Sequence, residues 1–251
     1  MKLAAIQYRP PKGNPVLARS GLAELLDQAG EQGADLIVCP EMATTGYIWH
    51  SPEDLAPFAE PARGPTLAML SEKAKAHRTW IVCGFAEDAG GLLYNSALVV
   101  DPWGDMVRCY RKVLLYDADL AWARPGRQRM SIGSDLGRIA PAICMDLNDD
   151  GLIRYLHQAG IDVLAFCTNW VDEGSEVHPY WTWRLAGWSG WVVAANTWGQ
   201  DEDTTFSGCS AIISPHKEII ASAAYLGDEV LLVDTENLPT RNVLPPSDPI
   251  W

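Results

Sequence analysis

Short apolar runs of strand length recur along the whole chain, and they limit its fold more than any other feature. They are rich in Val, Ile and aromatic residues and are bounded by Gly, Pro, Asp or Asn, as is typical of β-strands. Some, such as 36–39, are apolar at every position, which indicates burial on both faces. The predicted strands are residues 3–8, 34–39, 80–85, 96–100, 106–110, 138–144, 163–167, 191–195, 210–213 and 230–233.

Helical patterns lie between some of these runs. Apolar residues from 18 to 29 repeat at the spacing of one helix face, with Asn14-Pro15 as the expected start and Gly30 or Gly33 as the end. Further helices are predicted at 67–74 after Gly64-Pro65, at 152–156 capped by Asp149 or Asp150, and at 178–190. Residues 93–112 are expected to form a meander with 101–105 as its turn. The pattern predicts an α/β fold with a mixed sheet, or two packed sheets, and helices outside.

The length of 251 residues and the absence of a repeat or linker favour a single domain over 1–251. No run reaches the roughly 18–20 apolar residues of a membrane span. We interpret residues 1–8 as a first strand rather than a signal peptide, because no apolar core followed by a cleavage site is present. The expected location is therefore cytoplasmic.

Charge and cysteine spacing exclude several classes of partner. A net charge of −13 argues against nucleic acid and against an anionic membrane, since phosphate contacts need clustered Lys and Arg. None of the six cysteines has the two-residue spacing of a metal or redox pair, and His157 and His178 have no partner at metal spacing. We therefore expect no metal site and no disulfide framework.

Three of the predicted strands lead directly into a reactive side chain: Glu41, Lys112 and Cys144. In open α/β sheets reactive groups gather beyond the carboxyl ends of the strands. A cysteine needs help to become a thiolate at neutral pH, and a carboxylate can accept its proton. A lysine can hold that carboxylate charged and stabilise an oxyanion. The three positions together predict nucleophilic catalysis, although each alone is more often a loop acid, a surface charge or a core thiol.

The residues around these positions resemble the catalytic blocks of the nitrilase superfamily of carbon–nitrogen hydrolases. The blocks are residues 39–47 (Cys-Pro-Glu-Met-Ala-Thr-Thr-Gly-Tyr), 110–113 (Tyr-Arg-Lys-Val) and 142–146 (Ala-Ile-Cys-Met-Asp). Weaker similarities, including an Asn-Ser turn of the family at 94–97, extend over nearly the whole chain. They lie at residues 4–7, 94–97, 124–126, 194–196 and 206–210.

The resemblance implies a four-layer α-β-β-α sandwich without a cofactor, and a homodimer or higher homo-oligomer. It further implies that Glu41 is the general base, Cys144 the nucleophile and Lys112 an oxyanion-stabilising cation. The backbone N–H of Met145 would complete the oxyanion hole. Attack on an amide would release ammonia or an amine and leave a thioester, which water then hydrolyses.

The chain departs from the family's pattern after the lysine. Many relatives carry a second glutamate there, whereas this chain offers Asp117 or Asp119, each one methylene shorter. Either could take its place, or both could be solvated loop acids. Residues 144–148 most resemble the block of N-terminal amidases that act on Asn or Gln. The absence of an Arg near position 148 argues against an N-carbamoyl acid as substrate.

Several of the chain's 11 tryptophans cluster between residues 170 and 198. Most of these are expected in core or subunit packing. We place Trp170 and Asn169, which follow a strand, near the substrate, together with Tyr47.

The leading hypothesis is an amidase that acts on a small-molecule carboxamide, with an amino-acid or N-terminal side-chain amide as one option. The alternatives are an N-carbamoyl hydrolase, a nitrilase, and a non-catalytic scaffold of the same fold. A redox-sensing thiol protein is disfavoured because no resolving cysteine is near. The proline-rich tail at 244–251 is predicted not to be helical, and one role open to it is to wrap a neighbouring subunit.

Overall fold

Two six-stranded sheets form the centre of residues 1–238, the part of the chain that this computed structural model describes. The first has the order β14-β1-β2-β3-β4-β5 and the second the order β13-β12-β9-β8-β7-β6. The strands of the first sheet are β1 (Lys2–Gln7), β2 (Leu36–Val38), β3 (Trp80–Asp88), β4 (Leu93–Val100), β5 (Met106–Arg111) and β14 (Glu229–Asp234). Those of the second are β6 (Ile132–Ser134), β7 (Gly137–Ile143), β8 (Val163–Cys167), β9 (Trp191–Ala195), β12 (Ala211–Ile213) and β13 (Ile219–Ser222).

The two sheets are built alike. Each has three parallel strands at its centre, β1-β2-β3 in one and β7-β8-β9 in the other. Antiparallel strands flank these centres on both sides. The strands predicted from continuous apolar runs are the ones that form the buried parallel centres, as expected for strands covered on both faces.

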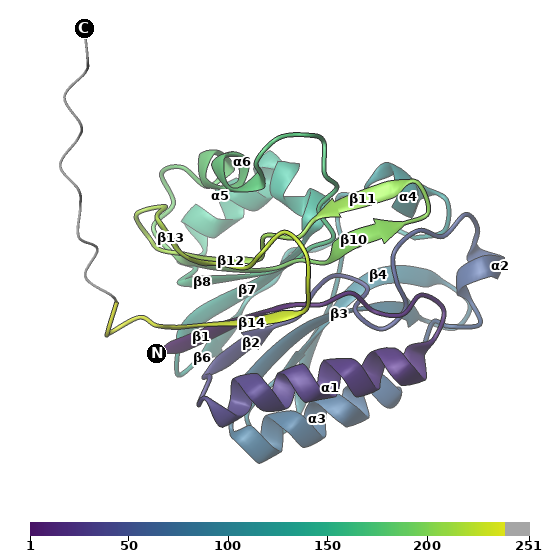
Figure 1. The fold of residues 1–251 in the computed structure, drawn as a ribbon, viewed down its shortest axis with the longest axis horizontal. Coiled ribbons are helices and arrows are strands. Elements are labelled where there is room, and N and C mark those ends of the chain that lie inside the picture. Colours follow the sequence, from purple (N-terminus) through teal and green to yellow (C-terminus); the bar gives the residue numbers. More distant parts are fainter. Residues whose placement is uncertain (239–251) are drawn as a thin grey trace, which may run out of the picture.

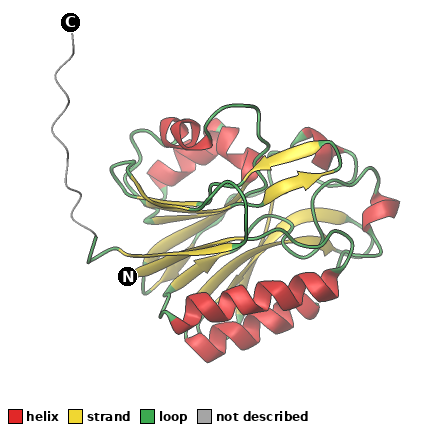
Figure 2. Cartoon of the chain, in the orientation of Figure 1, coloured by secondary structure: helices red, strands yellow, loops and turns green. Residues whose placement is uncertain are grey.

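Helices cover the outer face of each sheet, which gives four layers (Figures 1 and 2). Helices α1 (Pro15–Glu31) and α3 (Pro65–His77) pack on the first sheet, and α5 (Asp150–Gln158) and α6 (Val177–Arg184) pack on the second. Short elements at the edge of the sheets are α2 (Pro52–Leu55), α4 (Asp117–Leu120), the 3₁₀ turn Cys144–Asn148, and the hairpin β10 (Trp198–Asp201) and β11 (Thr204–Ser207). The predicted α-β-β-α sandwich is confirmed.

Each interface between layers has its own apolar core. One core lies between the sheets and joins residues such as Val38 and Val82 to Ile143 and Val163. A second joins the first sheet to α1 and α3, and a third joins the other sheet to α5 and α6. Helix α1 buries the five apolar residues that its sequence spacing indicated. Burial of these faces is the main favourable term that holds the layers together.

Local signals set most element boundaries. Asn14 caps α1 by accepting a hydrogen bond from the Leu17 N–H, and Asp149 caps α5 by accepting one from the Gly151 N–H. The helix predicted at 178–190 is shorter than expected and ends at Arg184. Gly187, with φ of 82°, adopts the left-handed conformation that a continuing helix cannot have. Strands β6, β10, β11 and β13 were not predicted, because they are short and only partly apolar.

No helix within residues 1–238 combines the length and the apolar character needed to cross a bilayer. The tail at 244–251, with its predicted role at a subunit contact, lies outside the described residues.

Candidate active site

The reactive side chains predicted from the sequence follow strands of both sheets. Glu41 follows β2 and Lys112 follows β5, both in the first sheet, whereas Cys144 follows β7 in the second. Strand β5 runs in the same direction as β3, because both are antiparallel to β4. The carboxyl ends of these strands therefore share one edge. Glu41 Oε2 accepts a hydrogen bond of 2.8 Å from the Asn169 N–H, which follows β8, so this edge faces the matching edge of the second sheet.

A fully buried network surrounds Lys112. Its Nζ lies 2.7 Å from Glu41 Oε1 and 2.6 Å from Asp119 Oδ2. Asn95 Nδ2 donates to the same two carboxylates, at 2.6 Å to Glu41 and 3.0 Å to Asp119. The Tyr116 N–H donates to Asp119 Oδ2 at 2.9 Å. An ammonium has three donors, so Lys112 retains one N–H for a ligand.

Burial and mutual charge set the protonation of this network. Burial raises the pKa of Glu41, and the charge of Asp119 raises it further, while Lys112 opposes the shift. Burial disfavours the ammonium form of Lys112, but the charges of Asp119 and Glu41 outweigh it and hold the Lys112 pKa well above its usual range. Lys112 therefore stays protonated, and the raised pKa of Glu41 makes this carboxylate a better proton acceptor.

The loop after β2 approaches β3 so closely that only glycine fits beside it. A Cβ atom on Gly84 would lie 2.5 Å from the Cα of Glu41 and 2.5 Å from the carbonyl oxygen of Pro40. Met42, directly after Glu41, has a φ of 49°. This tight turn directs the chain away from the sheet and leaves the Glu41 carboxylate inside the network.

Cys144 occupies the sharp turn between β7 and the 3₁₀ segment. Its φ of 40° lies in the left-handed region, which is uncommon for a residue other than glycine and is typical of functional turns. The residue is 8% exposed. Burial, together with the charge of Glu41, raises the pKa of the Cys144 thiol to about 12. The resting sulfur is a neutral thiol, so it needs a base to react.

The segment after β8 supplies hydrogen-bond donors beside this sulfur. Strand β8 pairs in parallel with β7, and Cys167 lies opposite Ile143, which places Thr168 beside Cys144. The Thr168 hydroxyl is buried and has no hydrogen-bond partner in the resting structure. The Thr168 hydroxyl and the Asn169 N–H both favour the thiolate and lower the pKa of Cys144, against the larger effects of burial and Glu41.

One carboxylate joins the segment of Lys112 to that of Cys144. Asp146 Oδ1 accepts from the N–H groups of Val113 and Leu114, at 3.0 and 2.8 Å. Its Oδ2 accepts from the Tyr110 hydroxyl at 2.7 Å and from the Ile143 N–H at 3.0 Å. Because these donors come from both sheets, Asp146 fixes the two strand ends relative to each other.

A cavity of about 230 Å³ opens on Cys144. This is below the roughly 300–1,000 Å³ of sites for drug-sized ligands, which favours a small ligand. Trp170, predicted near the substrate, forms part of the wall, and so do Asn169 and Met145. The lining residues are Tyr116, Cys144, Met145, Asn148, Asn169, Trp170, Val171, Glu173, Ser175, Glu176, Val177 and Tyr180.

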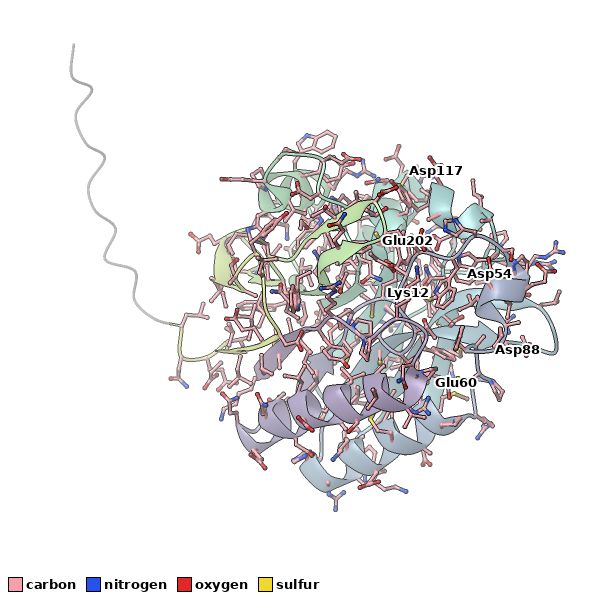
Figure 3. All side chains as sticks on the ribbon, turned by 45° about the vertical axis from the view of Figure 1, so that its right-hand side comes forward. Lys12, Asp54, Glu60, Asp88, Asp117 and Glu202 are labelled. Carbon is pink, nitrogen blue, oxygen red and sulfur yellow. The ribbon has the colours of Figure 1, made fainter. Side chains whose placement is uncertain are left out.

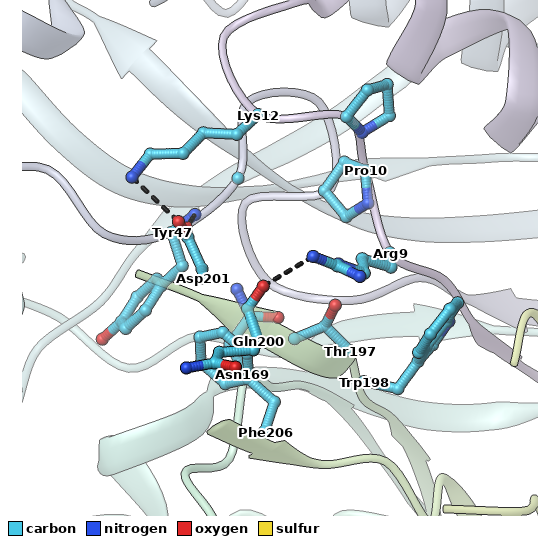
Figure 4. Close-up of a pocket in the computed structure, with 12 residues that line it drawn as sticks. Arg9, Pro10, Lys12, Tyr47, Asn169, Thr197, Trp198, Gln200, Asp201 and Phe206 are labelled. Carbon is cyan, nitrogen blue, oxygen red and sulfur yellow. Dashed lines mark hydrogen bonds and ion pairs between the residues drawn. The ribbon is translucent and has the colours of Figure 1, made fainter. Parts of the chain in front are cut away.

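Tyr47 lies at a neighbouring cavity of about 350 Å³, which Asn169 also lines (Figure 4). Two cations hold the rim of that cavity together: Arg9 donates to the Gln200 carbonyl oxygen, and Lys12 pairs with Asp201 at 2.9 Å. The Tyr47 ring lies 5.7 Å from Lys112 Nζ, and its buried hydroxyl has no partner. Tyr47 thus packs between this cavity and the Lys112 network.

Known proteins match this chain over most of its length. The family model for carbon–nitrogen hydrolases matches residues 2–237. A nitrilase of Pyrococcus abyssi is 31% identical over 96% of this chain and 92% of its own length. The chain belongs to the carbon–nitrogen hydrolase family. A protein N-terminal amidase of Schizosaccharomyces pombe is 29% identical to this hydrolase, over 85% of this chain and 91% of its own length.

Solved structures of amidases have the same fold as this hydrolase. An amidase from Nesterenkonia sp. AN1, solved with acrylamide added to its active-site cysteine, superposes with a TM-score of 0.83 at 20% identity, over 93% of this chain and 92% of its own. An N-terminal amidase with an Asn-Glu peptide superposes with a TM-score of 0.81 at 15% identity, over 92% of this chain and 96% of its own. At these identities the agreement concerns the fold.

The structure distinguishes the two aspartates that the sequence left open. Asp119 is fully buried against Lys112, whereas Asp117 is exposed at the start of α4 (Figure 3). Residues 94–97, expected as a turn, lie inside β4, and this position directs Asn95 at the two carboxylates. Sequence reasoning missed Asn95 and Thr168 as site residues. Their only signals were the resemblance at 94–97 and the position of Thr168 directly after a strand.

No group of three or more His, Cys, Asp or Glu side chains within residues 1–238 is arranged to hold a metal ion. The chemistry available at this edge is that of a thiol, a carboxylate and an ammonium.

Proposed function

We propose that this hydrolase is an amidase that cleaves small carboxamides through a thioester on Cys144. The observation that carries the proposal is the convergence of Glu41 and Lys112, at 2.7 Å, beside a thiol that opens on a small cavity. A relative from S. pombe and a structural neighbour from Nesterenkonia sp. AN1 bear the name amidase.

In the first half of the reaction, Glu41 accepts the thiol proton while the Cys144 sulfur attacks the amide carbon. The C–S bond forms, and the electron pair of the carbonyl moves to its oxygen. The remaining N–H of Lys112 and the backbone N–H of Met145 stabilise this oxyanion. When the oxyanion collapses, the C–N bond breaks, and Glu41 passes its proton to the departing ammonia.

In the second half, water attacks the thioester carbon while Glu41 accepts one of its protons. The C–S bond breaks, the carboxylic acid leaves, and the proton on Glu41 returns to the sulfur. Asp119 and Asn95 act as positioning residues, because they hold Lys112 and Glu41 through the hydrogen bonds described above.

The decisive test is ammonia release from a panel of small carboxamides by the wild type and by Cys144→Ala. The substitution removes one sulfur atom, so the fold is expected to persist while turnover is abolished. Cys109→Ala is the matched control, since Cys109 lies on β5 with its sulfur 3.7 Å from Glu87 and away from the cavity. A thioester adduct on Glu41→Gln, detected by intact mass, would support the order of steps. Ammonia release by Cys144→Ala would remove Cys144 from the proposed role.

Nitrile hydrolysis is the second candidate, because the relative from P. abyssi bears the name nitrilase. Ammonia release from matched nitriles and amides distinguishes the two. Hydrolysis of N-carbamoyl acids would also release carbon dioxide, and it is disfavoured because no Lys or Arg is among the described residues that line the Cys144 cavity. A non-catalytic scaffold would release ammonia from none of these compounds.

We further propose one hydrolase domain over 1–251, a homodimer or higher homo-oligomer, and a cytoplasmic location.

The proposed oligomer is supported by two aromatic side chains of α6, Tyr180 and Trp183. They are 37% and 65% exposed, as expected at a subunit contact. All six cysteines are unpaired, which fits a reducing compartment. Light scattering on a size-exclusion column tests the oligomeric state, and a mass equal to the monomer would contradict it.

A further inference from the structure

The charged side chains that line the Cys144 cavity all have one sign. They are Glu173 and Glu176, and the described residues on the cavity wall include no Lys or Arg. Both glutamates lie in the segment between β8 and α6 and are exposed at its rim. A ligand that enters the cavity therefore meets a negative potential first.

Aromatic rings accompany these carboxylates on the same wall. The rings of Trp170 and Tyr180 lie 5.6 Å apart, and Tyr116 lines the cavity beside Cys144. The faces of such rings attract cations through their quadrupole. Burial, followed by the charges of Asp117 and Glu173, raises the pKa of the Tyr116 hydroxyl. Carboxylates and ring faces together form the usual surroundings of a bound ammonium group.

Asn169 adds a buried acceptor to the wall of the cavity. The residue is 2% exposed, lines the cavity, and its Oδ1 has no hydrogen-bond partner. A buried acceptor without a partner carries a desolvation cost that a ligand N–H can remove. This unpartnered oxygen indicates a ligand that brings N–H donors to the site.

The buried cation of the site is not available to a carboxylate carried elsewhere on the substrate, because its remaining N–H serves the oxyanion. Lys112 lies between two carboxylates, at 2.7 Å from Glu41 and 2.6 Å from Asp119, so its charge is already balanced. A carboxylate on the substrate would meet Glu173 and Glu176 at the rim and no free cation behind them.

We propose that the Cys144 cavity selects carboxamides that carry a protonated amine over carboxamides that carry a carboxylate, with Glu173 and Glu176 as the specificity-determining residues. This inference rests on the proposed amidase function and narrows its substrate class.

Three small carboxamides test the proposal at pH 7: β-alaninamide, which is cationic, butyramide, its neutral isostere, and succinamate, which is anionic. The measured quantity is the ratio of kcat/KM for β-alaninamide to that for succinamate. We expect this ratio to be at least tenfold in the wild type and to fall about tenfold in the double variant Glu173→Gln/Glu176→Gln, because each exposed charge contributes only a few-fold. Added salt should reduce the wild-type ratio, since exposed charges are screened.

The control removes the same charge from the opposite outer layer. Glu31→Gln/Glu72→Gln changes two exposed glutamates of α1 and α3 and should leave the ratio unchanged. A wild-type preference for succinamate, or a ratio that the Glu173→Gln/Glu176→Gln variant does not change, would overturn the inference while hydrolysis of butyramide still supports the amidase. Failure of all three amides and of the wider panel would instead reject the proposed function.

Discussion

Among single residues, we expect the Thr168 hydroxyl to act on the thiolate form of Cys144. It is buried, has no partner, and lies beside the Cys144 sulfur. Its contribution lowers the pKa of Cys144, so we expect it to donate to the sulfur once the proton has left. A hydrogen bond to a charged group contributes about 1.5–3 kcal/mol, so its effect belongs to the thiolate and not to the thiol.

Thr168→Val should therefore lower kcat by about tenfold or more and shift alkylation of Cys144 by iodoacetamide to higher pH, because valine keeps the shape and removes the donor. Thr168→Ser should restore both values. The measurements are steady-state kinetics and the pH dependence of alkylation, followed by peptide mass. A valine variant with wild-type kcat and an unchanged alkylation profile would contradict this role.

The two neighbouring aspartates of α4 lead to a prediction about pH. Glu41 must be ionised to accept a proton, and its pKa is raised by burial and by the charge of Asp119. Activity is therefore lost when the pH falls through this raised pKa. Asp119→Asn removes one cause of the rise, so the acidic limb of kcat/KM should move to lower pH. Asp117→Asn, at the exposed position, should leave the limb in place, and equal shifts in the two variants would refute the assignment.

At the scale of elements, Asp146 connects the strand ends that carry Lys112 and Cys144. It accepts four hydrogen bonds from donors of both sheets. The 3₁₀ turn that follows Cys144 is too short to be stable by itself, so its position depends on these contacts.

Asp146→Ala should lower the free energy of unfolding by at least about 2 kcal/mol, because buried donors lose their acceptor. It should also reduce kcat, since the two strand ends are no longer held in register. Asp150→Ala is the matched control. Its carboxylate is 77% exposed and pairs with Arg184, and such a pair contributes at most about 1 kcal/mol. Urea denaturation and kinetics measure both effects, and equal losses in the two variants would be inconsistent with the connecting role.

At the scale of the whole molecule, the site is a buried charge system placed between two sheets. Lys112, Glu41 and Asp119 are all fully buried, and each carboxylate depends on the single ammonium. The stability of the fold is therefore coupled to the charge balance of the site.

Lys112→Met should abolish activity and lower the free energy of unfolding by about 3–5 kcal/mol at pH 7, because two buried carboxylates lose their partner. Without the cation, the pKa of Glu41 rises further in the folded state. The destabilisation is present above that pKa and decreases as the pH falls through it. Urea denaturation at pH 7 and pH 5 checks this, and the same loss at both pH values would contradict the charge argument.

Local patterns in the sequence predicted much of the fold and part of the candidate site. Apolar periodicity reports which side of a segment is buried, so it predicted the parallel strands and the four main helices. Glu41, Lys112 and Cys144 each follow a predicted strand, and this shared position indicated that they would gather at one edge of the sheets. These inferences needed only neighbouring residues, because burial and capping act within a few positions of the chain.

Tertiary structure decided everything that depends on distant segments. It buried Asp119 and exposed Asp117, two residues of the same type in the same short helix. It directed Asn95 of a β-strand at two carboxylates, and it placed Thr168 beside a sulfur that lies 24 positions earlier in the chain. The physical reason is that these contacts depend on which strands pair and on how the two sheets pack face to face. Neither leaves a periodic signal in the local sequence.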